Sequence, residues 1–333
     1  MEETILILPA LITFFSALLI LPKWINKCKQ IGLVWEDMNK PGHPKNVASS
    51  GGIVVVMAFT LGVLSYLAFR TFFRAQTEIN IQIFSLLTTI LIFAIVGLTD
   101  DLLGWKHGGL SKRLRVGLAV LGAVPLMVIN AGNSTMNFPL LGSIHLGLFY
   151  PLFLIPLGIA GASTTFNFLA GFNGLEAGQG ILMISFLSYV AYLQGVPWLT
   201  FIGALMVISL LVFYFYNKVP AKVFPGGTLT YTVGSLIAVM AILGNMEKIA
   251  IFVFIPVILE VILKTRGRLK KHSFGIPQKD GSLKVPYPKI YGLTHLSIFV
   301  LSKFKTKVYE KDVTYLIFAF QLLIIFLAWI IFL

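Results

Sequence analysis

Residues 146–180 read LGLFYPLFLIPLGIAGASTTFNFLAGFNGLEAGQG, and they hold the two features that decide how the chain folds. The part up to Phe166 is a continuous apolar run, long enough for a helix to cross about 30 Å of hydrocarbon. From Asn167 onward, asparagine, glutamate, glutamine and glycine gather in a short segment. We therefore expect a membrane-spanning helix that leads directly into a polar site.

The rest of the chain repeats the apolar half of this pattern. Of its 333 residues, 57% are hydrophobic and 12% are charged, which excludes an ordinary soluble globular domain. Because the apolar runs are continuous and do not alternate, they predict helices and not a β-barrel. The sequence predicts an all-α polytopic membrane protein, a single domain over residues 1–333, with about ten transmembrane helices. The expected spans are roughly 4–22, 47–69, 81–99, 116–131, 146–166, 177–194, 198–216, 229–244, 248–264 and 313–333.

The basic residues predict the orientation of these spans. If the N-terminus is outside, all of the 26 Lys and Arg except Arg70, Arg74 and Lys248 lie on the inner side. The net charge of +13 therefore belongs to one face, which would attract the headgroups of membrane lipids or a multiply charged anionic substrate. Nothing resembles a nucleic-acid-binding module. We expect a cell-membrane protein with its chemistry on the cytoplasmic face and a long basic inner loop, 265–312, containing an interfacial segment.

Two inner loops carry polar residues of a functional kind. In the first, Lys40 and the backbone N–H groups of Gly51 and Gly52 could contact a phosphate, although a solvated turn is the alternative. In the second, Asp100 and Asp101 are adjacent carboxylates at the end of a span, where ionised groups are costly without partners. Such a pair suits a proton acceptor or a metal contact, and ion pairing without a catalytic role is the alternative.

The polar half of the opening stretch is a third candidate site. Asn167 and Asn173 are uncharged, so their oxygens could contact a hard cation or a phosphate near the bilayer without the cost of burying a charge. Small residues also mark close helix packing in membranes, but Glu176 and Gln179 do not fit that alternative. A fourth candidate is a basic cluster suited to a diphosphate. It comprises Lys270, Lys271 and His272.

Taken together, these loops resemble the polyprenyl-phosphate N-acetylhexosamine-1-phosphate transferase family. The likeness is greatest to its archaeal and eukaryotic UDP-GlcNAc:dolichyl-phosphate GlcNAc-1-phosphate transferases. The segments that carry it follow one another through nearly the whole chain. They are EDMNK (36–40), GLTDDLLGW (97–105), NAGN (130–133), NFLAGFNGLEAGQ (167–179), KVFPGGT (222–228) and SKFKTK (302–307).

The resemblance implies a reaction and a set of partners. The family transfers GlcNAc-1-phosphate from UDP-GlcNAc to a polyprenyl (dolichyl) phosphate and releases UMP, which begins the assembly of a lipid-linked oligosaccharide. It implies Mg²⁺, with Mn²⁺ as an alternative, and a homodimer. Asp100 or Asp101 would keep the acceptor phosphate deprotonated, and Asn173 would ligate the metal. The implied substrate contacts are Glu36, Asp37, Met38, Lys40 and Gln179 towards the nucleotide, Arg115, Phe166, Asn167 and Gly174 towards the lipid phosphate, and Lys270, Lys271 and His272 on the donor diphosphate.

One position departs from the family pattern. Family members have aspartate as a metal ligand where this chain has Gly227, and glycine offers no carboxylate. Mg²⁺ prefers oxygen ligands that include a carboxylate, so we expect an enzyme of this class that is impaired. A non-catalytic homologue that binds UDP-sugar or lipid phosphate is one alternative. A lipid transporter is another, but it would need paired repeats and broken, charged helices at the bilayer midplane, which the sequence does not show.

Overall fold

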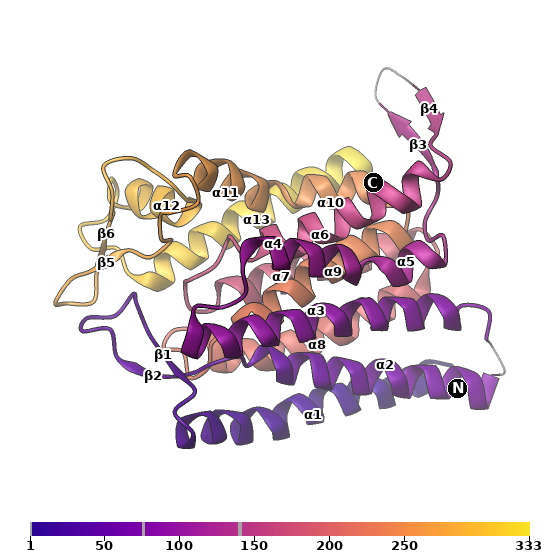
Figure 1. Cartoon of the computed structure of the whole chain (residues 1–333), viewed down its shortest axis with the longest axis horizontal. Coiled ribbons are helices and arrows are strands. Elements are labelled where there is room, and N and C mark those ends of the chain that lie inside the picture. The colour runs from indigo at the N-terminus through magenta and orange to yellow at the C-terminus, as the bar shows by residue number, and fades with distance from the viewer. Residues whose placement is uncertain (1, 75–76, 139–141) are drawn as a thin grey trace.

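The protein is a bundle of long helices that lie side by side, as a computed structural model of residues 2–74, 77–138 and 142–333 shows (Figure 1). Both termini lie at the same end of the bundle (Figure 1). The helices are α1 (Glu2–Gln30), α2 (Gly52–Arg74), α3 (Asn80–His107), α4 (Lys112–Gly122), α5 (Val124–Val128), α6 (Ile155–Phe166), α7 (Leu175–Leu193), α8 (Pro197–Asn217), α9 (Gly226–Leu243), α10 (Glu247–Val253), α11 (Ile255–Arg266), α12 (Leu293–Leu301) and α13 (Glu310–Phe332). A π-helical turn, Tyr150–Leu154, leads into α6.

These helices cover every span that the sequence predicts. Among the described residues, six helices are by themselves long and apolar enough to cross a membrane: α1, α2, α3, α8, α9 and α13. Two of the other predicted spans coincide with α7 and with the shorter apolar helix Tyr150–Phe166. The last two are each formed by a pair of consecutive helices, α4 with α5 and α10 with α11. Each pair is interrupted just before a proline, Pro125 or Pro256, since proline has no N–H to continue a helix. The prediction of an all-α polytopic membrane protein is confirmed.

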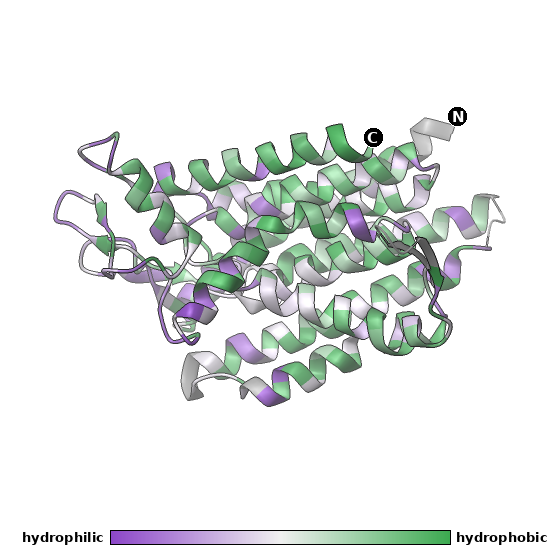
Figure 2. Ribbon diagram, turned by 90° about the horizontal axis from the view of Figure 1, so that it is seen from above, coloured by the Kyte–Doolittle hydropathy of each residue, from purple (hydrophilic) through white to green (hydrophobic). Residues whose placement is uncertain are grey.

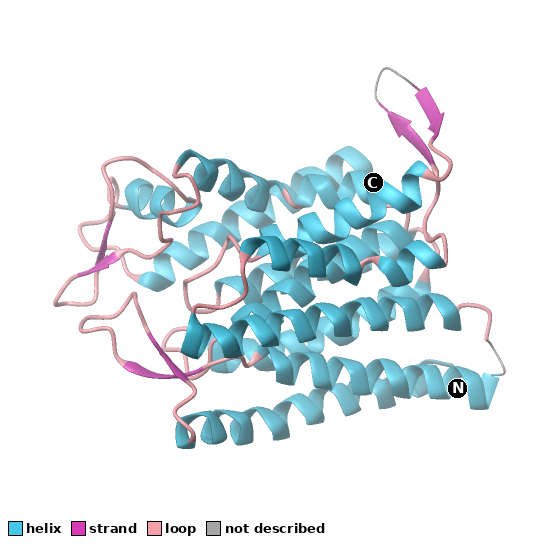
Figure 3. Ribbon diagram, in the orientation of Figure 1, coloured by secondary structure: helices cyan, strands magenta, loops and turns pink. Residues whose placement is uncertain are grey.

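In the part of the chain that the structure describes, the strands form three short antiparallel hairpins in the loops (Figure 3). Hairpins β1–β2 (Val34–Glu36, Lys45–Ala48) and β5–β6 (Ile276–Pro277, Leu283–Lys284) lie at one end of the bundle together with α12. Hairpin β3–β4 (Thr135–Phe138, Gly142–His145) lies at the opposite end, with the termini (Figure 1). Hydrophilic residues gather at the end that carries β1–β2, β5–β6 and α12, which we call the polar end (Figure 2).

Helix α9 forms the centre of the bundle. It is the most buried of the six spans and packs against α3 and α6, whereas α1 and α13 are mostly exposed along their lengths. Its first turn meets α3 at Gly97, where a side chain's Cβ would lie only 2.6 Å from the carbonyl group of Gly227. Glycine at position 97 therefore lets the start of α9 sit directly against α3, which places Gly227 at the polar end.

Replacing Gly97 by alanine should therefore push α9 away from α3. Overpacking of this kind costs about 1–3 kcal/mol of the free energy of unfolding, so the thermal midpoint of the purified protein should fall. Gly117→Ala in α4 is the matched control, because an added Cβ there meets nothing within 4 Å. Equal midpoints for the two variants would show that the close contact of α3 with α9 is unimportant.

Candidate active site

A cavity of about 570 Å³ opens at the polar end between four segments that are far apart in the sequence. They are the loop after β1, the turn between α6 and α7, the start of α9, and the loop between α11 and β5. Seven of the residues predicted for the site line this cavity, so the structure places these seven residues around one space. They are Glu36, Asp37, Met38, Asn167, Asn173, Gly227 and His272.

The turn between α6 and α7 builds one wall of the cavity. Gly171 and Gly174 have φ angles of +104° and +84°, a left-handed conformation that glycine adopts without strain. The backbone N–H of Gly171 donates to Glu176 Oε1 at 2.9 Å, and that of Gly174 donates to Asn217 Oδ1 at 3.1 Å. Side chains thus satisfy backbone groups that neither helix can bond, and the turn keeps one shape at the bilayer's edge.

Asn173 points its amide towards two carboxylates. Its Nδ2 donates to Asp37 Oδ2 at 3.0 Å and to Glu310 Oε2 at 3.4 Å, and its backbone N–H donates to Glu310 Oε1 at 2.8 Å. Glu310 also forms an ion pair with Lys40. The sequence prediction missed Glu310, which begins the last helix after a run of basic residues and has no recognisable motif around it.

The two adjacent aspartates face different partners. Asp101 accepts hydrogen bonds from the backbone N–H groups of Gly227 (2.6 Å) and Thr228 (3.2 Å) and from the Thr228 hydroxyl (2.8 Å), and so caps α9. Asp100 accepts from the N–H of Leu110 at 2.8 Å and lies 3.5 Å from the guanidinium of Arg115. Asp101 is therefore occupied in holding the fold, and the side chain of Asp100 is partly exposed, at 14%.

The glycine pair of the first inner loop does not offer its N–H groups to a phosphate. The N–H of Gly51 donates to the carbonyl of Phe224, and that of Gly52 donates to the carbonyl of Pro225. Of the two alternatives that the sequence left open for this loop, these contacts favour the structural one. The pair brings the start of α2 against the first turn of α9, since a Cβ at position 52 would lie 2.4 Å from the N atom of Leu229.

The other predicted contacts lie outside the cavity lining. Gln179 is buried in α7, and neither amide atom has a hydrogen-bond partner among the described residues. The Lys271 ammonium lies 4.7 Å from the ring centroid of Tyr287, and Lys271 is not part of the cavity lining. The remaining predicted residues outside the lining are Lys40, Asp100, Asp101, Arg115, Phe166, Gly174 and Lys270.

His295, a neighbour of His272, is neutral near pH 7. Burial, followed by the nearby Lys264 ammonium, lowers the pKa of His295 to about 4.

The described residues do not fit a preformed metal cage. No group of three histidine, cysteine, aspartate or glutamate side chains is placed to hold a cation in the described part of the chain. Gly227 contributes no side chain, and both oxygens of the neighbouring Asp101 already accept hydrogen bonds. Asn167 lies close to Gly227, because Thr230 Oγ1 contacts both Asn167 Oδ1 (2.9 Å) and the Gly227 carbonyl (3.3 Å).

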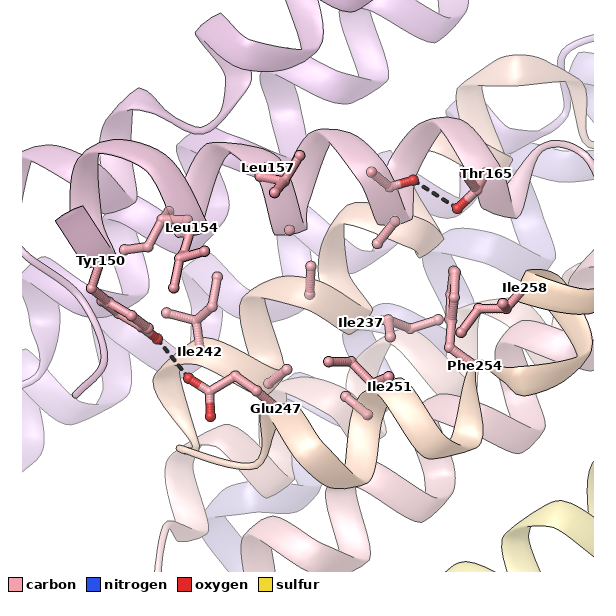
Figure 4. A pocket seen from close by; sticks show the side chains of 17 residues that line it. Tyr150, Leu154, Leu157, Thr165, Ile237, Ile242, Glu247, Ile251, Phe254 and Ile258 are labelled. Atoms are coloured by element: carbon pink, nitrogen blue, oxygen red, sulfur yellow. Dashed lines mark hydrogen bonds between the residues drawn. The ribbon is translucent and has the colours of Figure 1, made fainter. Parts of the chain in front are cut away.

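An apolar groove of about 410 Å³ runs between α6 on one side and α9, α10 and α11 on the other (Figure 4). Tyr150 and Glu247 close its end near the termini with a 2.5 Å hydrogen bond. Thr165 lies at its other end and turns its hydroxyl to the carbonyl of Gly161 (Figure 4). Thr165 lines the groove and Asn167, two residues further along, lines the polar cavity, so both spaces border the end of α6.

Comparison with known proteins gives consistent matches. Residues 83–245 match the model of glycosyl transferase family 4. A Saccharolobus solfataricus protein named as a UDP-N-acetylglucosamine–dolichyl-phosphate N-acetylglucosaminephosphotransferase is 34% identical over 90% of this chain and 89% of its own length. A Sulfolobus acidocaldarius protein with the same described activity is 31% identical, covering 97% of this chain and 95% of its own. A Dictyostelium discoideum protein of that name is 29% identical over 81% and 71% of the two chains.

Changing Asp101 to asparagine should weaken the attachment of α9. Asparagine keeps one accepting oxygen but loses the charge that favours the N–H groups at a helix start, and lost caps cost about 0.5–2 kcal/mol. The thermal midpoint should fall. Thr99→Val is the control from the same turn of α3, because its hydroxyl bonds only within the helix, to Ile95. A drop as large in Thr99→Val would contradict the capping role.

Proposed function

We propose that this chain, which belongs to glycosyl transferase family 4, transfers GlcNAc-1-phosphate from UDP-GlcNAc to a membrane polyprenyl phosphate of the dolichyl type. The products are GlcNAc-diphosphate-polyprenol and UMP, and the reaction begins the assembly of a lipid-linked oligosaccharide. The relatives named for this reaction cover nearly the whole chain.

One observation carries the proposal: an apolar groove and a polar cavity both border the end of α6. A polyprenyl tail fits the groove because its lining is mostly hydrocarbon, with the Tyr150–Glu247 pair at one end and Thr165 at the other. A nucleotide sugar fits the cavity, which offers Asp37, Asn167 and His272 for hydrogen bonding. The acceptor phosphate would then lie at the end of α6 near Asn167, within reach of a donor in the cavity.

The orientation of the site in the membrane is part of the proposal. The polar end carries the loops with most of the lysine and arginine, and such loops stay on the cytoplasmic side of a membrane. We place the reaction on the cytoplasmic face of the cell membrane, where soluble UDP-GlcNAc is present. A homodimer rests on the family resemblance and is not required by the geometry of the cavity.

The reaction is a single in-line displacement at phosphorus. An oxygen of the polyprenyl phosphate bonds to the β-phosphorus of UDP-GlcNAc, while the bond from that phosphorus to the bridging oxygen breaks and UMP leaves with the electron pair. Asp100 takes the proton of a monoprotonated acceptor phosphate, and the guanidinium of Arg115 beside it attracts the resulting dianion. His272, in the cavity lining, donates a hydrogen bond to the donor diphosphate.

The metal requirement follows from the family, and the chain's own residues supply little for it. Mg²⁺, or Mn²⁺ in its place, would be held by the uncharged amide oxygens of Asn173 and Asn167 in the cavity lining, with no carboxylate at position 227. An added Cβ at Gly227 would lie 3.2 Å from Asp101 Oδ1 and 3.3 Å from the ring of Tyr231. An aspartate therefore fits with small adjustments and would place a second carboxylate beside Asp101.

Restoring that carboxylate should increase activity. In membranes supplied with radiolabelled UDP-GlcNAc and polyprenyl phosphate, Gly227→Asp should release UMP faster than the parent and reach half-maximal rate at lower Mg²⁺. Gly117→Ala is the control, because an added Cβ at position 117 meets nothing within 4 Å. Equal rates and equal Mg²⁺ dependence in parent and Gly227→Asp would show that glycine at position 227 does not impair the enzyme. If neither chain forms lipid-linked sugar with any UDP-sugar of a panel, the proposed reaction is wrong.

Asp100→Asn should reduce turnover because it removes the proton acceptor while keeping the size of the side chain. A general base contributes about 10² to 10⁴ in rate, and the loss should fall in this range with UDP-GlcNAc binding retained. Asp280→Asn is the control, since Asp280 pairs with Lys307 in the loop of β5–β6, outside the cavity lining. Parental turnover in Asp100→Asn would remove Asp100 from the mechanism.

A further inference from the structure

Glu310 lies where three segments of the polar cavity converge, although it does not line the cavity itself. It is the first residue of α13 and is 3% exposed. Removing a carboxylate from water is costly unless charged partners and hydrogen bonds compensate. Its partners therefore indicate what the burial achieves.

The partners of Glu310 come from two distant segments. Oε1 accepts from the backbone N–H of Asn173 at 2.8 Å and from Asn39 Nδ2 at 3.3 Å. Oε2 accepts from Asn173 Nδ2 at 3.4 Å and pairs with the ammonium of Lys40. One carboxylate thus binds the loop after β1 to the turn between α6 and α7.

Asn39 extends this connection to a third segment. Its Nδ2 also donates to the carbonyl of Gly171 at 2.8 Å, and its Oδ1 accepts from the N–H of Gly275 at 3.1 Å. Gly275 follows Phe274, which lines the cavity beside His272. The three segments that Glu310 and Asn39 join are therefore three of the four that enclose the cavity.

We propose that Glu310 is a positioning residue for the nucleotide-sugar donor: it fixes Asn173, Asn39 and Lys40 so that Asp37, Met38 and the α6–α7 turn face one cavity. This rests on the proposed function and adds to it a residue that contacts no substrate. Because Lys40 is paired with Glu310, its ammonium is already neutralised, and its role is to hold the loop after β1 in place.

The test is equilibrium binding of radiolabelled UDP-GlcNAc to the purified full-length chain in lipid nanodiscs. Glu310→Ala should weaken binding at least about tenfold, which corresponds to about 1.4 kcal/mol. Glu310→Gln should fall between parent and Glu310→Ala, because its one amide oxygen still accepts from Asn173 while its NH₂ group faces Lys40. Asp312→Asn is the matched control two residues further along, since Asp312 pairs with Lys305 and caps α13 without touching the network.

The possible outcomes separate a positioning role from a purely structural one. If Glu310 only stabilises the bundle, Glu310→Ala lowers the thermal midpoint and yield while the folded fraction binds donor as the parent does, and the proposal is wrong. If Glu310→Ala does not fold, Glu310→Gln decides in the same way. If the parent itself binds no UDP-GlcNAc, the proposed function fails and this proposal fails with it. If the parent binds and the Glu310 variants bind equally, only this proposal fails.

Discussion

The contact between Asp101 and the first turn of α9 is the interaction on which the rest of the polar end depends. A carboxylate at the end of α3 accepts three hydrogen bonds from Gly227 and Thr228, and Gly97 allows the two helices to approach closely enough for this. Because α9 lies at the centre of the bundle, its start sets the position of the cavity wall that faces Asn167. A charge that is costly at the edge of a bilayer is thereby used to fix a helix.

Much of this architecture could be predicted from hydropathy alone. Spans appear wherever apolar residues continue for the thickness of a bilayer, and the polar loops fall at one end because lysine and arginine follow the orientation rule. The clustering of Glu36, Asp37, Asn167, Asn173 and Gly227 was also predicted, since each belongs to a polar segment at that end. What the sequence could not give is pairing across long distances. Glu310, near the C-terminal end of the sequence, contacts Asn173 and Lys40, and no local sequence pattern predicts these contacts.

Residue roles were harder to predict than residue positions. Asp100 and Asp101 looked equivalent as neighbours on a helix, but successive residues point in different directions, and only one of them meets α9. The sequence left open whether the Gly51–Gly52 pair contacts a phosphate or only forms a turn, and its N–H groups in fact donate to the segment before α9. In both cases tertiary contacts, which are invisible in a single sequence, decide whether a polar group is free for substrate.

We propose that a lipid tail in the α6 groove and a donor in the polar cavity meet at the end of α6. Cross-links from a photoreactive polyprenyl phosphate, mapped by mass spectrometry, test this arrangement. Peptides 150–166 and 247–258 should be labelled, and unlabelled polyprenyl phosphate should suppress the labelling, because these segments line the groove. Labelling confined to the exposed outer faces of α1 and α13, and unchanged by the competitor, would contradict it.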